Sequence, residues 1–84
     1  MTNKDILKKR ILYNSQHRGM KEMDLILGNF VNKYINIFTR NELNTLESLL
    51  NVNDEILYKW YFNKKTNNQI PESIVSKKLK KFKL

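Results

Sequence analysis

The sequence predicts an all-α fold, a compact bundle of about five short helices. Apolar residues recur at steps of three and four positions, the spacing that places them on one face of a helix. No segment has the alternating pattern of a strand pair. The linkers between the helical patterns are short, so consecutive helices should pack against each other. We therefore expect the 84 residues, 1–84, to form a single helical domain with a small core.

The first helix is expected from about Asp5 to Ser15. Thr2 or Asn3 can cap its start through a side-chain oxygen. Asp5 suits the first turn, because the helix dipole favours a negative charge there. Residues 8–10 add a basic cluster to this helix.

The second helix carries the strongest pattern, an apolar stripe that runs from Met20 to Phe38. Glu22 lies on the side opposite to this stripe, toward solvent or a partner, and Asp24 lies at its edge. Gly28 falls inside the pattern and costs about 1 kcal/mol relative to alanine. The sequence therefore leaves open whether this element is one helix or two.

Capping signals predict the starts of three further helices. Thr39 and Glu42 fit a capping box, in which the glutamate side chain reaches back to the threonine amide. Asn53 can cap a fourth helix, and Pro71 suits the first position of a fifth. The expected inner faces contain Leu43, Leu46, Leu50, Leu57, Trp60, Tyr61, Ile74, Val75, Leu79 and Phe82.

The net charge of +8 is concentrated at the end of the chain. Residues 77–84 contain five lysines and no acid, and without those lysines the net charge is +3. A basic surplus first suggests nucleic acid or an anionic membrane as a partner. Glu42 and Glu47 in the third helix would repel a phosphate backbone, however. We expect a flexible, solvated lysine-rich tail from about residue 77, and no nucleic-acid partner.

Motifs of enzyme chemistry are missing from the sequence. There is no cysteine, and the single histidine, His17, lies in a polar segment without other metal-ligand side chains nearby. Glu22 and Asp24 point about 200° apart on a helix, so they cannot form a catalytic pair by themselves. No glycine-rich phosphate loop or nucleophile elbow is present. We therefore expect a protein that is not an enzyme.

The stretch from Arg18 to Asp24 is the candidate site. One interpretation is a plain turn between helices, with Gly19 supplying a backbone angle that other residues resist. The other is that the turn displays Arg18 and Glu22, together with Asp24, as a charged recognition site. Local physics alone favours the plain turn.

A resemblance to a known family favours the recognition site. The segments Arg10 to Tyr13 and Arg18 to Phe30 resemble the succinate dehydrogenase assembly factor family, whose hallmark is an Arg-Gly-x-x-Glu motif. The resemblance covers about Lys8 to Val75, and residue 17 is His where many relatives have a basic residue. The matching residues are Arg18, Gly19 and Glu22 in the motif, Glu42, Leu43, Leu49 and Leu50 further on, and Asp54, Tyr58 and Trp60 in an Asp…Tyr-x-Trp segment.

The resemblance implies a small helical protein that binds the flavoprotein subunit of succinate dehydrogenase, and in some bacteria fumarate reductase. It further implies that the protein promotes covalent attachment of FAD to a histidine of that subunit, without stably binding a cofactor itself. By this analogy Gly19 allows close approach of the backbones, and Arg18 braces the loop or pairs with a carboxylate. The expected partner-binding residues are Arg18, Gly19 and Glu22, followed by Arg10, Asp24 and Tyr58.

The alternative is a small regulatory or antitoxin-like protein, or a basic nucleic-acid-associated protein. We further expect a monomer. We also expect no membrane insertion, because no apolar run approaches the roughly 20 residues that span a bilayer. Residues 1–5 lack the features of a signal or transit peptide. On that ground we expect a bacterial cytoplasmic location rather than the mitochondrial matrix.

Overall fold

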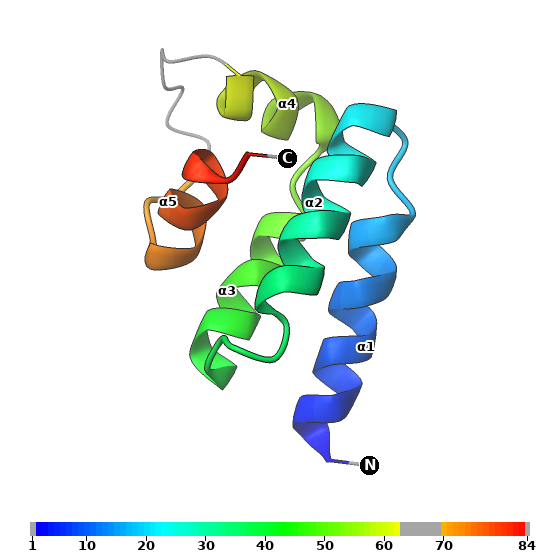
Figure 1. The fold of residues 1–84 in the computed structure, drawn as a ribbon, viewed down its shortest axis with the longest axis vertical. Coiled ribbons are helices and arrows are strands. Elements are labelled where there is room, and N and C mark those ends of the chain that lie inside the picture. The colour runs from blue at the N-terminus through cyan, green and yellow to red at the C-terminus, as the bar shows by residue number, and fades with distance from the viewer. Residues whose placement is uncertain (1, 63–69, 84) are drawn as a thin grey trace.

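The computed structural model describes residues 2–62 and 70–83, which form five helices and no strand. The helices are α1 (Asn3–Gln16), α2 (Lys21–Tyr34), α3 (Arg40–Leu50), α4 (Asp54–Phe62) and α5 (Ile74–Lys81). α1 packs against α2 and α3, α4 packs against α2, and α5 packs against α3 (Figure 1). The predicted all-α class is confirmed.

The core is built from apolar side chains of all five helices, and Phe30 on α2 is among its fully buried members. The Phe30 ring centroid lies 4.9 Å from that of Tyr34, 6.1 Å from that of Phe38 and 5.4 Å from that of Phe82. These contacts join α2 to the turn that follows it and to the segment after α5. Burial of apolar surface, mostly aliphatic with a few aromatic rings, is the main source of stability in a chain this small.

The helix starts show which capping signals the chain uses. The predicted capping box of Thr39 and Glu42 is present, and Thr2 forms a second one with Asp5. The expectation that Pro71 begins the fifth helix is wrong, because α5 begins at Ile74 and is capped by Ser73. The Ser73 hydroxyl accepts a hydrogen bond from the Ser76 amide, which otherwise lacks a partner inside the helix.

α2 is a single helix that continues through Gly28 and ends at Tyr34, before the apolar stripe ends. Ile35 and Phe38 follow in a turn and are still buried, so the stripe extends beyond the helix. Gly28 is buried against α1, and a Cβ atom placed on it would lie 3.8 Å from the backbone oxygen of Ser15. That distance is an ordinary van der Waals contact.

We therefore expect Gly28→Ala to stabilise the protein. Alanine loses less backbone freedom in a helix than glycine does, so the free energy of unfolding should rise by about 0.5–1 kcal/mol. Urea denaturation monitored by circular dichroism measures this change. A loss of stability would instead mean that α1 and α2 cannot accommodate the extra methyl group.

The lysine-rich segment differs from the tail expected from about residue 77. Residues 77–81 form the second half of α5, and Leu79 is fully buried. Phe82 is half-buried and packs on Phe30. The lysines therefore project from a packed helix whose apolar face belongs to the core. Among the described residues, no helix is both long enough and apolar enough to span a membrane.

Candidate functional site

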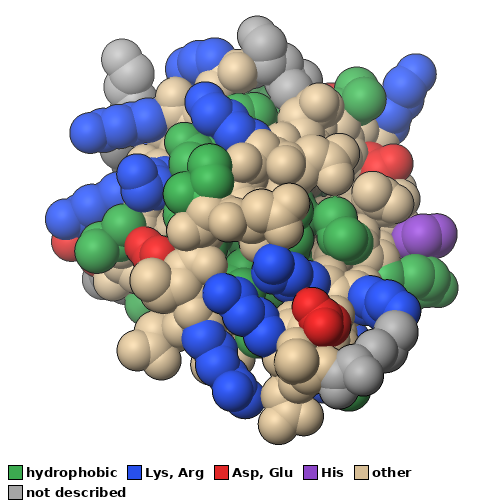
Figure 2. All heavy atoms as spheres, turned by 60° about the horizontal axis from the view of Figure 1, so that its bottom comes forward, with side chains coloured by type: hydrophobic (Ala, Val, Ile, Leu, Met, Phe, Trp, Pro, Cys, Tyr) green, Lys and Arg blue, Asp and Glu red, His purple; other side chains and the backbone are tan. Residues whose placement is uncertain are grey.

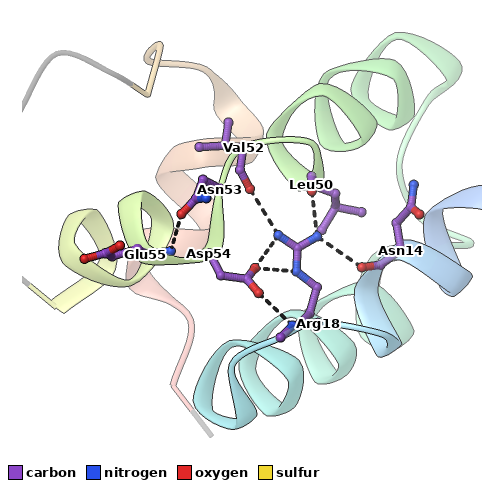
Figure 3. Close-up of polar contacts among 8 residues, drawn as sticks. Asn14, Arg18, Leu50, Val52, Asn53, Asp54 and Glu55 are labelled. Carbon is purple, nitrogen blue, oxygen red and sulfur yellow. Dashed lines mark hydrogen bonds and ion pairs between the residues drawn. The ribbon is translucent and has the colours of Figure 1, made fainter.

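Arg18 lies in the junction between α1 and α2 and turns its side chain inward, where only 9% of it is exposed (Figure 3). Its Nε lies 2.6 Å from Oδ1 of Asp54, and its Nη2 lies 2.5 Å from the same oxygen. Its Nη1 donates to the backbone oxygens of Leu50 at 2.6 Å and Asn14 at 3.1 Å. Its Nη2 also donates to the backbone oxygen of Val52 at 3.1 Å. One guanidinium therefore joins α1, the end of α3 and the start of α4.

The local sequence explains why an arginine is needed at this position. Asn14 and Leu50 lie in the last turns of α1 and α3. Backbone carbonyls there accept no hydrogen bond from within the helix and need donors from elsewhere. A guanidinium offers five N–H donors in a fixed plane, whereas a lysine ammonium is a point charge with three. The positive charge is also favourable near the negative ends of two helix dipoles.

Gly19 supports the same junction through its backbone. Its amide donates to Oδ2 of Asp54 at 2.9 Å, so both oxygens of this carboxylate are bonded to the junction. The expectation that Gly19 supplies an angle other residues resist is wrong, because no glycine among the described residues has a positive φ. A Cβ atom at Gly19 would lie 3.7 Å from Asp54 Oδ2, which is an ordinary contact. Gly19 itself is exposed, and it leaves the surface beside the ion pair uncovered.

Glu22 and Asp24 lie in the first turn of α2, but their surroundings differ. Glu22 is exposed, on the outer side of the helix as predicted. Asp24 is half-buried, and its Oδ1 has no hydrogen-bond partner among the described residues. Leu25 is 50% exposed and lies next to Glu22, since residues three apart are neighbours on a helix. The outer face of α2 therefore pairs a carboxylate with apolar surface.

Arg10 and Tyr58 make their contacts away from the junction around Arg18. Arg10 Nε lies 2.8 Å from Glu47 on α3, and this hydrogen bond and charge raise the pKa of the guanidinium. The Arg10 side chain is 58% exposed. Tyr58 is half-buried, and its ring centroid lies 4.6 Å from that of Phe62. The described contacts do not bring either residue to Arg18.

Asp54 is the residue that the sequence analysis missed as part of this site. Its position at the start of α4 is explained equally well by the helix dipole, so local sequence gives it no further role. Its partner Arg18 is 36 residues away in the chain, a separation that no helical periodicity predicts. The available signal was its place in the Asp…Tyr-x-Trp segment of the resemblance.

The junction has the properties of a scaffold rather than those of a reactive centre. Arg18 uses its N–H groups on Asp54 and three carbonyls, so it is not available to bind a substrate anion. The described residues include no cluster of three or more His, Cys, Asp or Glu side chains suited to a metal ion. What the arrangement can do is hold the start of α2, and with it Glu22, in a fixed position.

Comparisons with known proteins give a consistent family. A family model described as "Flavinator of succinate dehydrogenase" matches residues 9–83. The chain is 41% identical over 56 residues to succinate dehydrogenase assembly factor 2, mitochondrial, of Scheffersomyces stipitis, which covers 67% of this chain and 38% of the relative. It is 36% identical over 74 residues to the protein of that name in Arabidopsis thaliana, covering 88% and 38%. It is 36% identical over 86 residues to that of Candida glabrata, covering 95% and 56%. No solved structure matches the chain.

Two facts follow from these relatives. The matches span 38%, 38% and 56% of the relatives' lengths, so the chain corresponds to only part of each. The expectation of a bacterial cytoplasmic location is wrong, because these relatives are named as mitochondrial proteins. The composition of residues 1–5, on which that expectation depended, does not report the location.

Proposed function

The chain belongs to the succinate dehydrogenase assembly factor family, and on that premise we propose that it binds the flavoprotein subunit of succinate dehydrogenase and promotes covalent attachment of FAD to it. The observation that carries this proposal is the family match over residues 9–83, which includes the whole candidate site from Arg18 to Asp24. The names of the relatives support mitochondria as the place of action. The alternative partner in this proposal is fumarate reductase, a flavoprotein of the same type.

In this proposal the chain acts by docking and supplies no bond-making group. The flavin and its host protein provide the chemistry, and the assembly factor favours the host conformation in which the reacting atoms are aligned. The cavity between the start of α3 and α5, lined by residues such as Thr45 and Val75, holds about 150 Å³. Pockets for small-molecule ligands usually measure roughly 300–1,000 Å³, so this cavity is too small for FAD.

The docking surface in this proposal is the outer side of the first turns of α2. Glu22 offers a charge, Leu25 offers exposed apolar area, and the bare Gly19 backbone permits close approach. Arg18 contributes by fixing the junction from inside, which keeps these groups in one arrangement before binding. Preorganisation of this kind raises affinity because less freedom is lost on docking.

Deleting the gene for this chain tests the proposal. The flavoprotein subunit should then carry little covalent flavin, seen as lost fluorescence of the denatured subunit band. Re-expression of the wild-type chain is the control and should restore the fluorescence. Normal covalent flavin in the deletion strain would contradict the proposal.

The nucleic-acid alternative cannot be tested by deleting the lysine-rich residues 77–84. That deletion would also remove Leu79, which is fully buried, so loss of function would follow from unfolding under either hypothesis. Substitution of exposed lysines leaves the core intact and therefore separates charge from folding.

A further inference from the structure

A basic surface lies at the end of the bundle where α2 meets α3, and residues from three helices and a turn form it. Lys33 on α2 and Lys78 on α5 both approach the Tyr34 ring, with Nζ atoms 5.4 and 5.7 Å from its centroid. The Tyr34 carbonyl accepts a hydrogen bond from the Ile37 amide. Next to Ile37, Asn36 accepts a hydrogen bond from Lys8 on α1 at 3.0 Å. These contacts make the surface continuous, and we call it the basic end.

The basic end combines charge with exposed apolar area. Ile37 is 68% exposed and stands in the turn between the lysines of α1 and α2. Figure 2, which turns this end of the molecule forward, shows Lys and Arg side chains grouped around hydrophobic ones, with few acidic side chains among them. Within residues 2–62 and 70–83, no carboxylate forms an ion pair with Lys33 or Lys78. The charges of Lys33 and Lys78 are therefore not neutralised by an ion pair among the described residues, whereas Lys8 interacts electrostatically with Asp5.

The lysines are held in place rather than spread through solvent. The face of an aromatic ring attracts an ammonium group, and each such contact contributes roughly 0.5–1 kcal/mol at an exposed site. Lys33 also lies 5.8 Å from the Phe82 ring centroid, so two rings hold its amine. Two ammonium groups at one ring repel each other, and an external anion relieves that repulsion.

We propose that the basic end binds the surface of an anionic phospholipid bilayer. Lysines near such a surface are attracted to its headgroups, and an exposed isoleucine gains by entering the boundary between headgroups and acyl chains. A nucleic-acid phosphate backbone would use the lysines but would leave Ile37 against a charged groove without gain. The combination of lysines with an exposed isoleucine therefore favours lipid over nucleic acid. The chain would lie on the bilayer without crossing it.

The position of the basic end leaves the docking surface free. Glu22 and Lys33 lie near opposite ends of α2, a helix of 14 residues. At about 1.5 Å per residue the helix is roughly 20 Å long. A bilayer could thus hold one end of the bundle while the other end faces a protein. This inference does not depend on the proposed function, since it rests on the basic end alone.

Vesicle sedimentation with the full chain tests the inference. Vesicles of phosphatidylcholine containing roughly 30% phosphatidylserine should bind the chain, and vesicles of phosphatidylcholine alone should not. Lys33→Gln with Lys78→Gln should weaken binding about 30-fold, because each lysine near an anionic surface contributes about a factor of five. Ile37→Ser should weaken binding about ten-fold without changing net charge.

The control is Lys21→Gln with Lys59→Gln, which removes two positive charges from exposed residues outside the basic end, one of them from the exposed ion pair of Lys59 with Glu55. This variant should bind anionic vesicles within a factor of about three of wild type, since distant charges are screened. Equal losses in the two double variants would overturn the proposal, and so would equal binding to both kinds of vesicle. Tighter binding to a duplex DNA of about 20 base pairs than to the anionic vesicles would assign the basic end to nucleic acid instead.

Discussion

Arg18→Ala should lower the free energy of unfolding by about 3–5 kcal/mol, the loss expected when one partner of a buried ion pair is removed. The variant would leave the Asp54 carboxylate without its guanidinium and three backbone carbonyls without their donor. Because small domains have only about 5–15 kcal/mol of stability, this substitution consumes much of the total. Urea denaturation followed by Trp60 fluorescence and circular dichroism measures the change.

Arg10→Ala is the matched control for the loss at Arg18. Each of the two arginines forms an ion pair with a carboxylate on a distant helix, Arg10 with Glu47 and Arg18 with Asp54. Arg10 is 58% exposed and Arg18 is 9% exposed, so water screens the first pair far more than the second. The Arg10 variant should lose less than about 1 kcal/mol. Similar losses for the two variants would contradict the structural role assigned to Arg18.

Arg18→Lys separates charge from geometry at the same position. Lysine keeps the positive charge next to Asp54, but a single ammonium cannot serve the carboxylate and three carbonyls together. We expect this variant to recover less than half of the stability lost in Arg18→Ala. Full recovery would show that the charge alone stabilises the junction.

The features that the sequence predicted well are those with short-range causes. The capping box of Thr39 and Glu42 depends on residues three positions apart, and the outward position of Glu22 depends on the period of one helix. Both are confirmed because the groups involved meet through the helix that contains them. The five helices follow from the same kind of signal.

The features that the sequence could not predict depend on how the helices meet. The bond between Arg18 and Asp54 joins residues 36 positions apart, and it exists only once α1, α3 and α4 have packed. α2 ends at Tyr34, but the apolar stripe continues to Phe38. The residues beyond the helix are buried in a turn, and apolar residues buried in a turn look the same in the sequence as those on a helix face. The lysines from residue 77 onward resembled a solvated tail, yet the buried Leu79 among them fixes that segment to the core.

These differences change the role of each residue in the Arg-Gly-x-x-Glu motif. The structure gives Arg18 intramolecular partners, so its effect on a partner protein would be indirect, through the shape of the junction. Gly19 has no angle that other residues resist, and its amide completes the contact with Asp54. Glu22 remains the motif side chain that is exposed and outside this network. The motif thus divides into a supporting part and a displayed part.

Glu22→Gln should abolish most of the proposed activity while leaving the fold intact. The substitution keeps the shape of the side chain and removes its charge, so the free energy of unfolding should change by less than about 1 kcal/mol, mainly through the helix dipole. If Glu22 forms a charge-assisted hydrogen bond with the flavoprotein subunit, losing it should weaken that complex by about 30-fold or more. Calorimetric titration with the subunit measures affinity, and fluorescence of the denatured subunit measures covalent flavin.

Glu55→Gln provides the comparison that makes the result at Glu22 decisive. Glu55 is also an exposed acid in the first turn of a helix, with a side chain that is 70% exposed, so it carries the same dipole contribution and the same change in net charge. Its variant should bind the subunit as the wild type does. If both variants bind equally well, Glu22 is not a contact. Weaker binding in Glu22→Gln with unchanged stability, together with weaker binding and lower stability in Arg18→Ala, would show that Glu22 contacts the partner and that Arg18 stabilises the fold of the same motif.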